Sequence, residues 1–248
     1  MKIIILAAGY AVRLQPLTLN TPKPLLTIGG RTIVDRIIDK IDSLGGRDRI
    51  FIVSNAKFSA RFSGWAKASA AKDRITVIDD GTTNNENRLG AIRDLDLVIE
   101  GNAIDDDVLV VAGDNLFEFD LKKFLDFAHA RKDGVSIAAY DIGDLALAKN
   151  FGVVKVDDAG TVVDFEEKPS APKSTLVSTG IYYFPKNKLS FIKEYVKMQD
   201  KLDAPGYCIS WLAKRDKVYG YSFLEDWYDI GSIESYKEAD NKYKERER

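Results

Sequence analysis

Short runs of β-branched residues alternate with amphipathic segments along the first half of the chain. Ile3 to Leu6 forms one such run, and residues 32–44 then carry apolar side chains at helical spacing up to Gly45-Gly46. The alternation continues with predicted strands at 50–53, 75–78 and 108–112, and predicted helices near 58–71 and 89–100. Strands that are apolar on both faces are typical of a parallel sheet covered by helices.

The second half has a different pattern. A predicted helix at 121–132 and a strand at 135–140 are followed by alternating runs at 152–156, 161–167, 177–184 and 217–223. Such runs favour antiparallel pairing. We therefore expect an α/β fold with a Rossmann-like, mostly parallel mixed sheet flanked by helices and a smaller antiparallel insertion. The charged run Lys242 to Arg248 predicts a solvated, fraying helix end.

The charge balance of the chain disfavours two classes of partner. The 248 residues include 36 basic and 38 acidic side chains, so the formal net charge is −2. Proteins that bind nucleic acids or membrane surfaces usually carry a basic excess or a polybasic stretch. The apolar run after Met1 is too short for a signal peptide, so we expect a cytoplasmic protein with no nucleic-acid or membrane partner.

The chain has one histidine, His129, and one cysteine, Cys208. A single cysteine excludes an internal disulfide and any cysteine-rich zinc site. His129 falls in a helical pattern beside charged residues and is expected to be a solvated helix residue, whereas Cys208 is expected to be a small buried apolar residue. Any chemistry must then rest on carboxylates, Lys, Arg or a hard metal ion.

The loop Leu6 to Leu14, with Gly9 and Arg13, follows the first strand. Small residues at this edge of an open α/β sheet let backbone N–H groups approach phosphate oxygens, although the same residues can simply make a tight turn. The dinucleotide fingerprint G-x-G-x-x-G is not met, because Ala11 and Leu14 stand in place of glycines. A dehydrogenase is therefore disfavoured.

Four further short segments could carry charge to the same edge. Each also has a structural explanation when taken alone, as a polar loop, a turn, a strand-ending ion pair or the start of a helix. The segments are Pro22-Lys23-Pro24, Gly113-Asp114, Glu167-Lys168-Pro169 and Trp227 to Gly231, which contains Asp229.

In their order and spacing these segments resemble the sugar-1-phosphate nucleotidyltransferases, a family that includes glucose-1-phosphate thymidylyltransferases and uridylyltransferases. The resemblance runs from Met1 to about Ala239 and is also carried by the segments Gly81 to Ala91, Phe151 to Val154 and Ser178 to Tyr182. It implies that a sugar 1-phosphate attacks the α-phosphorus of a nucleoside triphosphate, with dTTP or UTP and glucose 1-phosphate as the favoured pair. It also implies a single catalytic domain over 1–248, with a nucleotide-binding half (1–120), a sugar-phosphate-binding half (121–240) and no C-terminal β-helix domain.

The resemblance also implies a role for each matching residue. Arg13, Lys23 and Asp114 would be catalytic, and Asp114 with Asp229 would hold Mg²⁺. The nucleotide would contact Leu6, Ala8, Gly9, Arg13, Lys23, Gly81, Leu89 and Gly90. The sugar phosphate would contact Gly152, Glu167, Lys168 and Thr179. Relatives often assemble as homo-oligomers, but no residue pattern here marks an interface.

One departure from the family pattern affects the phosphate loop. The family usually reads G-x-G-[ST]-R, whereas this chain has Ala11, which disfavours positive φ, and Val12, which lacks a hydroxyl donor. Two alternatives therefore stay open. One is a CTP-dependent choline-phosphate cytidylyltransferase, whose aromatic cage would draw on Tyr182, Tyr183, Tyr207, Trp211, Trp227 and Tyr228. The other is a non-catalytic regulatory relative that binds nucleotide or sugar phosphate.

Overall fold

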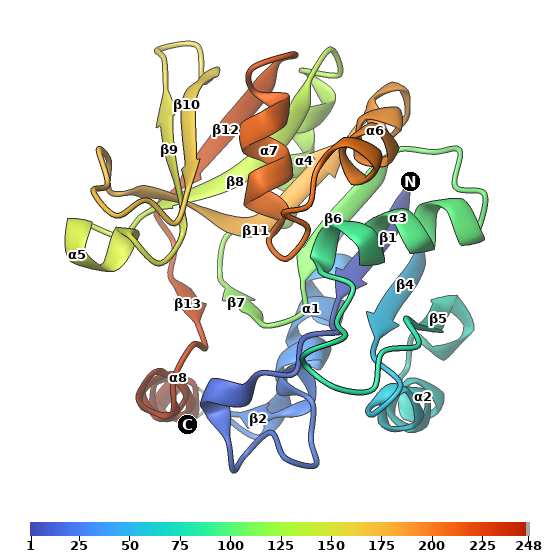
Figure 1. Cartoon of the computed structure of the whole chain (residues 1–248). Helices are drawn as coiled ribbons and strands as arrows, with labels where there is room; N and C mark the ends of the chain where they lie inside the picture. Colours follow the sequence, from blue (N-terminus) through green and yellow to red (C-terminus); the bar gives the residue numbers. More distant parts are fainter. Residues whose placement is uncertain (247–248) are drawn as a thin grey trace.

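The computed structural model describes residues 1–246 and is built on a nine-stranded mixed sheet. Its parallel part has four strands in the spatial order β6 (Val108–Ala112), β1 (Lys2–Leu6), β4 (Arg49–Ser54) and β5 (Ile75–Asp79) (Figure 1). Side chains of β1 alternate between two cores, with Ile3 and Ile5 in one and Ile4 in the other. This burial on both faces explains why these strands are continuous apolar runs.

The remaining strands extend the sheet past β6. The strand β11 (Leu176–Phe184) is antiparallel to β6, and β8 (Val135–Asp141) is antiparallel to β11. The hairpin β9 (Gly152–Val156) and β10 (Val162–Glu167) joins β11 through Val177 and Val153. The predicted α/β class with a mostly parallel central sheet and smaller antiparallel parts is thus confirmed. One strand differs, because β12 (Val218–Phe223) pairs in parallel with β8.

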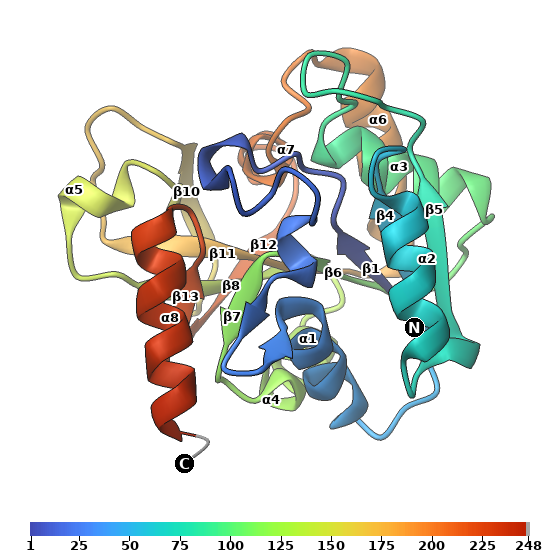
Figure 2. The same cartoon turned by 90° about the horizontal axis from the view of Figure 1, so that it is seen from below.

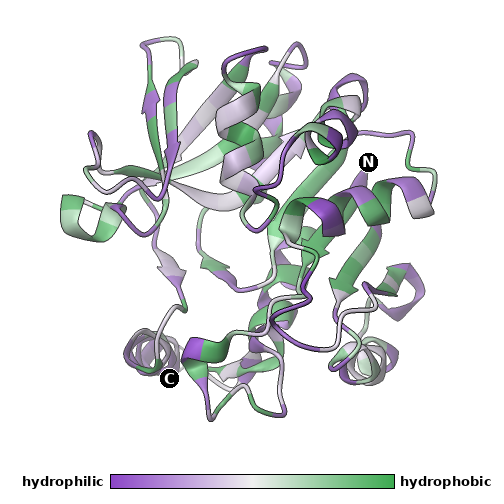
Figure 3. Ribbon diagram, in the orientation of Figure 1, coloured by the Kyte–Doolittle hydropathy of each residue, from purple (hydrophilic) through white to green (hydrophobic). Residues whose placement is uncertain are grey.

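Helices cover both faces of the sheet. One face carries α1 (Ile33–Asp42), α2 (Ser59–Ala68) and α4 (Leu121–His129), which lie in front of the sheet in Figure 2. The other face carries α3 (Ala91–Gly101), α6 (Ser190–Met198) and α7 (Pro205–Leu212). A short helix, α5 (Leu145–Ala148), leads to the β9–β10 hairpin. Figure 3 shows the central strands as the most hydrophobic part of the chain and the outer loops as hydrophilic.

Two very small sheets lie outside the main one. The first pairs β2 (Thr27–Ile28) with β3 (Arg31–Thr32), and the second pairs β7 (Asn115–Phe117) with β13 (Trp227–Asp229). In the second sheet Asp229 lies opposite Asn115. A segment near the end of the chain is thereby brought beside the turn that follows β6.

The last described helix, α8 (Ile233–Arg246), exposes its charged residues from Lys242 onward at the predicted solvated end, but this end is held in place and does not fray up to Arg246. Tyr243 is buried, and its hydroxyl donates a hydrogen bond to Glu118. Arg246 makes ion pairs with Glu118 and Asp226. These contacts dock the end of α8 against the turn after β7, and residues 247–248 lie outside the described residues.

The single histidine and the single cysteine have the environments expected of them. His129 is exposed at the end of α4 and packs edge-on against Tyr183. Cys208 is buried in α7, and burial raises the pKa of its thiol to about 12. Among residues 1–246, the model contains no helix whose length and hydrophobicity would let it span a bilayer.

Candidate active site

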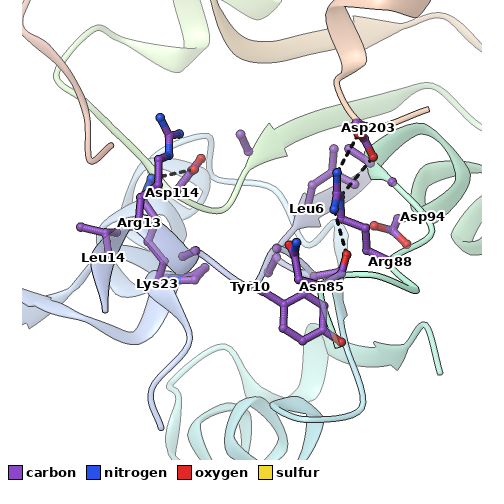
Figure 4. Close-up of a pocket in the computed structure, with 18 of the residues that line it drawn as sticks. Leu6, Tyr10, Arg13, Leu14, Lys23, Asn85, Arg88, Asp94, Asp114 and Asp203 are labelled. Atoms are coloured by element: carbon purple, nitrogen blue, oxygen red, sulfur yellow. Dashed lines mark hydrogen bonds and ion pairs between the residues drawn. The ribbon is translucent and has the colours of Figure 1, made fainter. Parts of the chain in front are cut away.

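A cavity of about 350 Å³ opens at the carboxyl ends of β1 and β6. The loop after β1, the Lys23 turn and Asp114 line one side of it, while Asp80, Asp94 and the segment around Arg88 line the other. Figure 4 shows Arg13, Lys23 and Asp114 at one side of the view and Arg88, Asp94 and Asp203 at the other. The carboxyl edge of an open parallel sheet is where such folds bind ligands.

A buried asparagine, Asn55, holds the loop after β1 in place. Asn55 donates a 2.8 Å hydrogen bond from Nδ2 to the carbonyl of Ala8, and its Oδ1 accepts from the backbone N–H of Phe58. The space next to Gly9 is open, since an added Cβ would meet nothing within 4 Å. The loop therefore presents backbone and a small residue to the cavity, as a phosphate site requires.

Ala11 corrects part of the sequence-based expectation for this loop. The residue adopts the left-handed conformation that it was expected to disfavour, with φ 46° and ψ 45°. Its carbonyl accepts hydrogen bonds from Thr18 Oγ1 at 2.8 Å and from the backbone N–H of Leu14 at 3.0 Å. These two bonds offset the cost of about 1 kcal/mol that an L-residue incurs in this conformation.

Lys23 joins the two predicted metal carboxylates. Although charged, it is only 8% exposed, and it lies at the first position of the turn η2 (Lys23–Leu25). Its Nζ donates a 2.9 Å hydrogen bond to Asp114 Oδ2 and lies 3.9 Å from Asp229 Oδ1. Asp114 and Asp229 therefore both lie close to the Lys23 ammonium, and their role as metal ligands stays a prediction.

The charges around this position shift the two carboxylates in opposite directions. Burial opposes ionisation of Asp114, but the Lys23 ammonium, with a contribution from Arg13, outweighs it and lowers the pKa of Asp114. Burial raises the pKa of Asp229 even though Lys23 acts the other way, and the charge of Asp114 adds to the rise. Asp114 is thus the carboxylate held ready as an anion.

The opposite side of the cavity is acidic and was not anticipated. Asp80 accepts hydrogen bonds from the N–H and the hydroxyl of Thr82, both at 2.7 Å, and Tyr10 shares a 3.1 Å bond with the same hydroxyl. Asp94, in the first turn of α3, is only 5% exposed. The sequence signal for Asp94 was an acid within the apolar stripe that contains Leu95 and Val98.

A second loop reaches this side from far along the chain. Arg88 pairs side-on with Asp203, with Nη2 to Oδ2 at 2.9 Å and Nε to Oδ1 at 3.2 Å. The carbonyl of Leu202 accepts from the N–H of Ile92 at 3.1 Å, and an added Cβ on Gly90 would lie 2.6 Å from that carbonyl oxygen. Gly90, at φ 91°, is therefore required where the 202–203 segment closes over the start of α3.

The predicted nucleotide contacts divide into two sets. Those that line the cavity are Leu6, Ala8, Gly9, Arg13, Lys23 and Gly90. Gly81 is exposed in the loop after β5, and Leu89 is half-buried, and neither lines the cavity. Residues that line it and escaped the sequence interpretation include Asp80, Asn85, Asp94, Asp203 and Ile230.

Of the predicted sugar-phosphate contacts, Gly152 and Glu167 lie on the neighbouring hairpin and Lys168 directly follows it, whereas Thr179 lies on β11. None of the four lines this cavity. Glu167 pairs with Gly152 across β10 and β9, and its side chain is 7% exposed. Burial raises the pKa of Glu167, while the charge of Lys168 acts in the opposite direction. The charge of Lys168 also acts against the rise in the pKa of Asp229, so the end of the hairpin lies close enough to influence that carboxylate.

Thr179 connects these two regions through an asparagine that the sequence interpretation missed. Its hydroxyl donates to the carbonyl of Ala138 at 3.1 Å, which occupies that donor within the protein. Asn115 donates from Nδ2 to the carbonyl of Thr179 at 2.6 Å and accepts from Trp227 Nε1 at 2.8 Å. Asn115 thus ties β11 and β13 together beside Asp114.

The aromatic side chains that a choline cage would require do not gather around the cavity, and Tyr10 is its only aromatic lining residue within 1–246. Tyr182 and Tyr183 are buried in opposite cores, and Trp211 stacks with Arg215. Trp227 packs edge-on against Phe151. This arrangement gives no support to the choline alternative.

Comparisons with known proteins agree with the geometry. The family model described as nucleotidyl transferase matches residues 2–246. The chain is 32% identical over 244 residues to the bifunctional protein GlmU of Methanocaldococcus jannaschii. The aligned region covers 98% of this chain and 54% of that protein. It is 30% identical over 266 residues to glucose-1-phosphate adenylyltransferase 1 of Vibrio cholerae, covering 95% of this chain and 64% of the relative.

A solved structure shows the same fold. A crystal structure from Bacillus anthracis, provisionally named a glucose-1-phosphate thymidylyltransferase and holding sucrose, superposes with a TM-score of 0.80 at 23% identity, over 98% of this chain and 95% of that one. The chain spans about half to two thirds of the length of the two curated relatives. By its family match over almost all described residues, the chain belongs to the nucleotidyl transferase family of sugar-1-phosphate nucleotidyltransferases.

Proposed function

We propose that the protein transfers a nucleotidyl group from a nucleoside triphosphate to a sugar 1-phosphate, glucose 1-phosphate being the favoured acceptor. The observation that carries the proposal is the convergence of Lys23, Asp114 and Asp229 on one cation position beside a phosphate-type loop. Family membership supports the reaction class. The first expectation for the donor was dTTP or UTP, on whole-chain resemblance.

In the proposed reaction, an oxygen of the sugar phosphate attacks the α-phosphorus of the triphosphate. A new P–O bond forms, the bond from the α-phosphorus to the bridging oxygen breaks, and pyrophosphate leaves with that electron pair. Arg13 and Lys23 supply positive charge where negative charge accumulates on the phosphates. This chemistry requires positioning and charge rather than an imidazole base, which agrees with the exposed position of His129 outside the cavity.

The donor set fits magnesium as the proposed cofactor. Within residues 1–246, no group of three or more His, Cys, Asp or Glu side chains is arranged to hold a metal ion. Asp114 and Asp229 would then supply two carboxylates, and phosphate oxygens and water would supply the other ligands, which is the usual arrangement for Mg²⁺. When bound, the ion supplies charge that neutralises the phosphates. The Lys23 ammonium that both carboxylates approach marks the place for such a charge.

A coupled assay tests the proposal. Purified protein is incubated with Mg²⁺, each common nucleoside triphosphate, and a panel of sugar 1-phosphates plus choline phosphate. Pyrophosphate release and the nucleotide sugar are both measured. Release that requires a sugar 1-phosphate supports the proposal, whereas release only with choline phosphate supports the cytidylyltransferase alternative. Bound nucleotide without turnover over the whole panel would favour the regulatory alternative.

A further inference from the structure

Two buried carboxyl oxygens at the acidic side of the cavity lack a hydrogen-bond partner. They are Asp80 Oδ2 and Asp94 Oδ1, each shielded from solvent. Both residues line the same cavity, and the charge of Asp80 helps to raise the pKa of Asp94, so the two acids lie close enough to affect each other's ionisation at a site with little water. Two ionised carboxylates in this position would repel strongly, and one proton held between them satisfies both oxygens.

The surroundings decide where this proton resides. Burial raises the pKa of Asp80, and the two hydrogen bonds that its carboxylate accepts from Thr82 act against this rise. Asp94 is the more deeply buried of the two, and burial together with the charge of Asp80 raises the pKa of Asp94 to about 8. The other charged group that acts on Asp80 is Asp79, also an acid. The nearby Arg88 is directed to Asp203 and to the carbonyl of Asn85 (Figure 4).

The position of the pair within the cavity indicates which part of a nucleotide it meets. Lys23, Arg13 and Asp114 lie at the other side and are suited to phosphates. Asp80 and Asp94 line the side formed by the loop after β5 and the start of α3. Repulsion excludes phosphate from an acidic wall, so the nucleoside end of the ligand lies here if the triphosphate lies at Lys23.

We propose that the Asp80–Asp94 pair selects nucleobases that carry an exocyclic amino group, namely cytosine, adenine or guanine, over uracil and thymine. This inference rests on the proposed function. It disfavours dTTP and UTP, the donors that the whole-chain resemblance implies. With its proton committed between the two side chains, the pair has only acceptor oxygens left, and both residues line the cavity. An amino group donates hydrogen bonds to such oxygens.

The recessed position of Asp94 strengthens this preference. At 5% exposure, its carboxyl group can be reached only by a donor that projects from the edge of the base. An exocyclic amino group projects in this way. Uracil and thymine instead offer a ring N–H flanked by two carbonyl oxygens. These oxygens would face the acceptor oxygens of the acidic wall and be repelled by them.

The test measures direct binding of CTP, ATP, GTP, UTP and dTTP to the full chain by isothermal titration calorimetry, with Mg²⁺ and without sugar phosphate. At least one amino-bearing nucleotide is expected to bind about 10- to 100-fold more tightly than UTP and dTTP. In Asp94→Leu that nucleotide should lose most of this advantage, while affinity for UTP and dTTP should not fall. Asp94→Asn, which is neutral and of the same shape, should retain the preference.

The matched control is Asp96→Leu, the same substitution on α3 at a residue that does not line the cavity. It should leave all five affinities unchanged. The inference is overturned if wild-type protein binds UTP or dTTP at least as tightly as every amino-bearing nucleotide, or if it binds none of the five. It is equally overturned if a folded Asp94→Leu variant loses affinity for all five by the same factor. Failure of the proposed function would instead appear as nucleotide binding without pyrophosphate release.

Discussion

Lys23 donates a 2.9 Å hydrogen bond to Asp114, a residue 91 positions later in the chain. The contact joins the Pro-Lys-Pro turn after the first strand to the Gly-Asp turn after a neighbouring strand. Gly113 permits this approach, because its N–H donates to the carbonyl of Leu6 at 2.8 Å and an added Cβ would lie 2.8 Å from that oxygen. Two turns that are unremarkable alone thus form one charged site.

Replacing Lys23 by methionine should abolish most of the proposed activity. The change removes the charge that Asp114 and Asp229 share and leaves two carboxylates facing each other. Loss of such a charge is expected to lower kcat by about 100-fold or more. Pyrophosphate release measures the effect, and Lys122→Met, at an exposed lysine of α4, is the control that should keep full activity. A fully active Lys23→Met variant would remove Lys23 from the mechanism.

The Arg88–Asp203 pair should affect nucleotide binding more than stability. Its side chains are 42% and 60% exposed, so breaking it should cost less than about 1 kcal/mol of unfolding free energy. The pair nevertheless holds the loop before α3 against the 202–203 segment at the cavity. We expect Arg88→Gln to raise the nucleotide KM several-fold with a smaller change in kcat.

The charge-swapped variant Arg88→Asp with Asp203→Arg should restore part of this KM. Lys193→Gln breaks a similarly exposed ion pair between α6 and α3 and is the matched control. Steady-state kinetics at a fixed sugar phosphate concentration separate KM from kcat. An Arg88→Gln variant whose nucleotide KM equals that of the control would contradict the positioning role.

Gly90→Ala should destabilise the protein by about 2 kcal/mol or more. The residue has φ 91°, and an added methyl group would lie 2.6 Å from the carbonyl oxygen of Leu202. Gly64→Ala, in α2, meets nothing within 4 Å and should instead stabilise the protein by about 0.5–1 kcal/mol. Urea unfolding measures both changes. Equal unfolding free energies for the two variants would show that the 202–203 segment does not constrain Gly90.

Asp94 should make stability decrease as pH rises. Its pKa is raised by burial from the ordinary 3.8 to about 8, so the folded state binds more protons than the unfolded state between these values. The stabilising proton is therefore fully present at low pH and is lost as pH approaches 8. Urea unfolding at about pH 5, 7 and 9 should show Asp94→Asn gaining stability relative to wild type across this range. A constant difference between the two proteins would contradict a shared proton.

The parallel half of the fold could be predicted because each of its strands is apolar on both faces. The run Val108 to Ala112, for example, needs no partner to be identified as a central strand. The three-residue strand Trp227–Asp229 could not be predicted, since it exists only through pairing with Asn115–Phe117. Helix α7 was also missed, because its residues are mostly apolar and give no amphipathic period.

The candidate site shows the same division. Lys23 and Asp114 could be predicted from short motifs, because Lys23 is held between two prolines and Asp114 closely follows the central strand β6. Asp94 and Asp203 could not, because an acid on a helix or in a loop becomes part of a cavity only when distant segments meet. The contact between Leu202 and the start of α3 joins two such distant segments. Gly90 is the residue near α3 whose type reflects this contact.

We expect Asp114 to serve a metal-dependent nucleotidyl transfer, and a magnesium titration distinguishes this role from a structural one. Pyrophosphate release is followed for wild-type protein and for Asp114→Asn as Mg²⁺ is titrated, with circular dichroism confirming that both are folded. Release should need both a sugar 1-phosphate and Mg²⁺ in the wild type, and it should fall by about 100-fold or more in the variant at every Mg²⁺ concentration. Full release by folded Asp114→Asn, or by the wild type in excess chelator, would contradict this role.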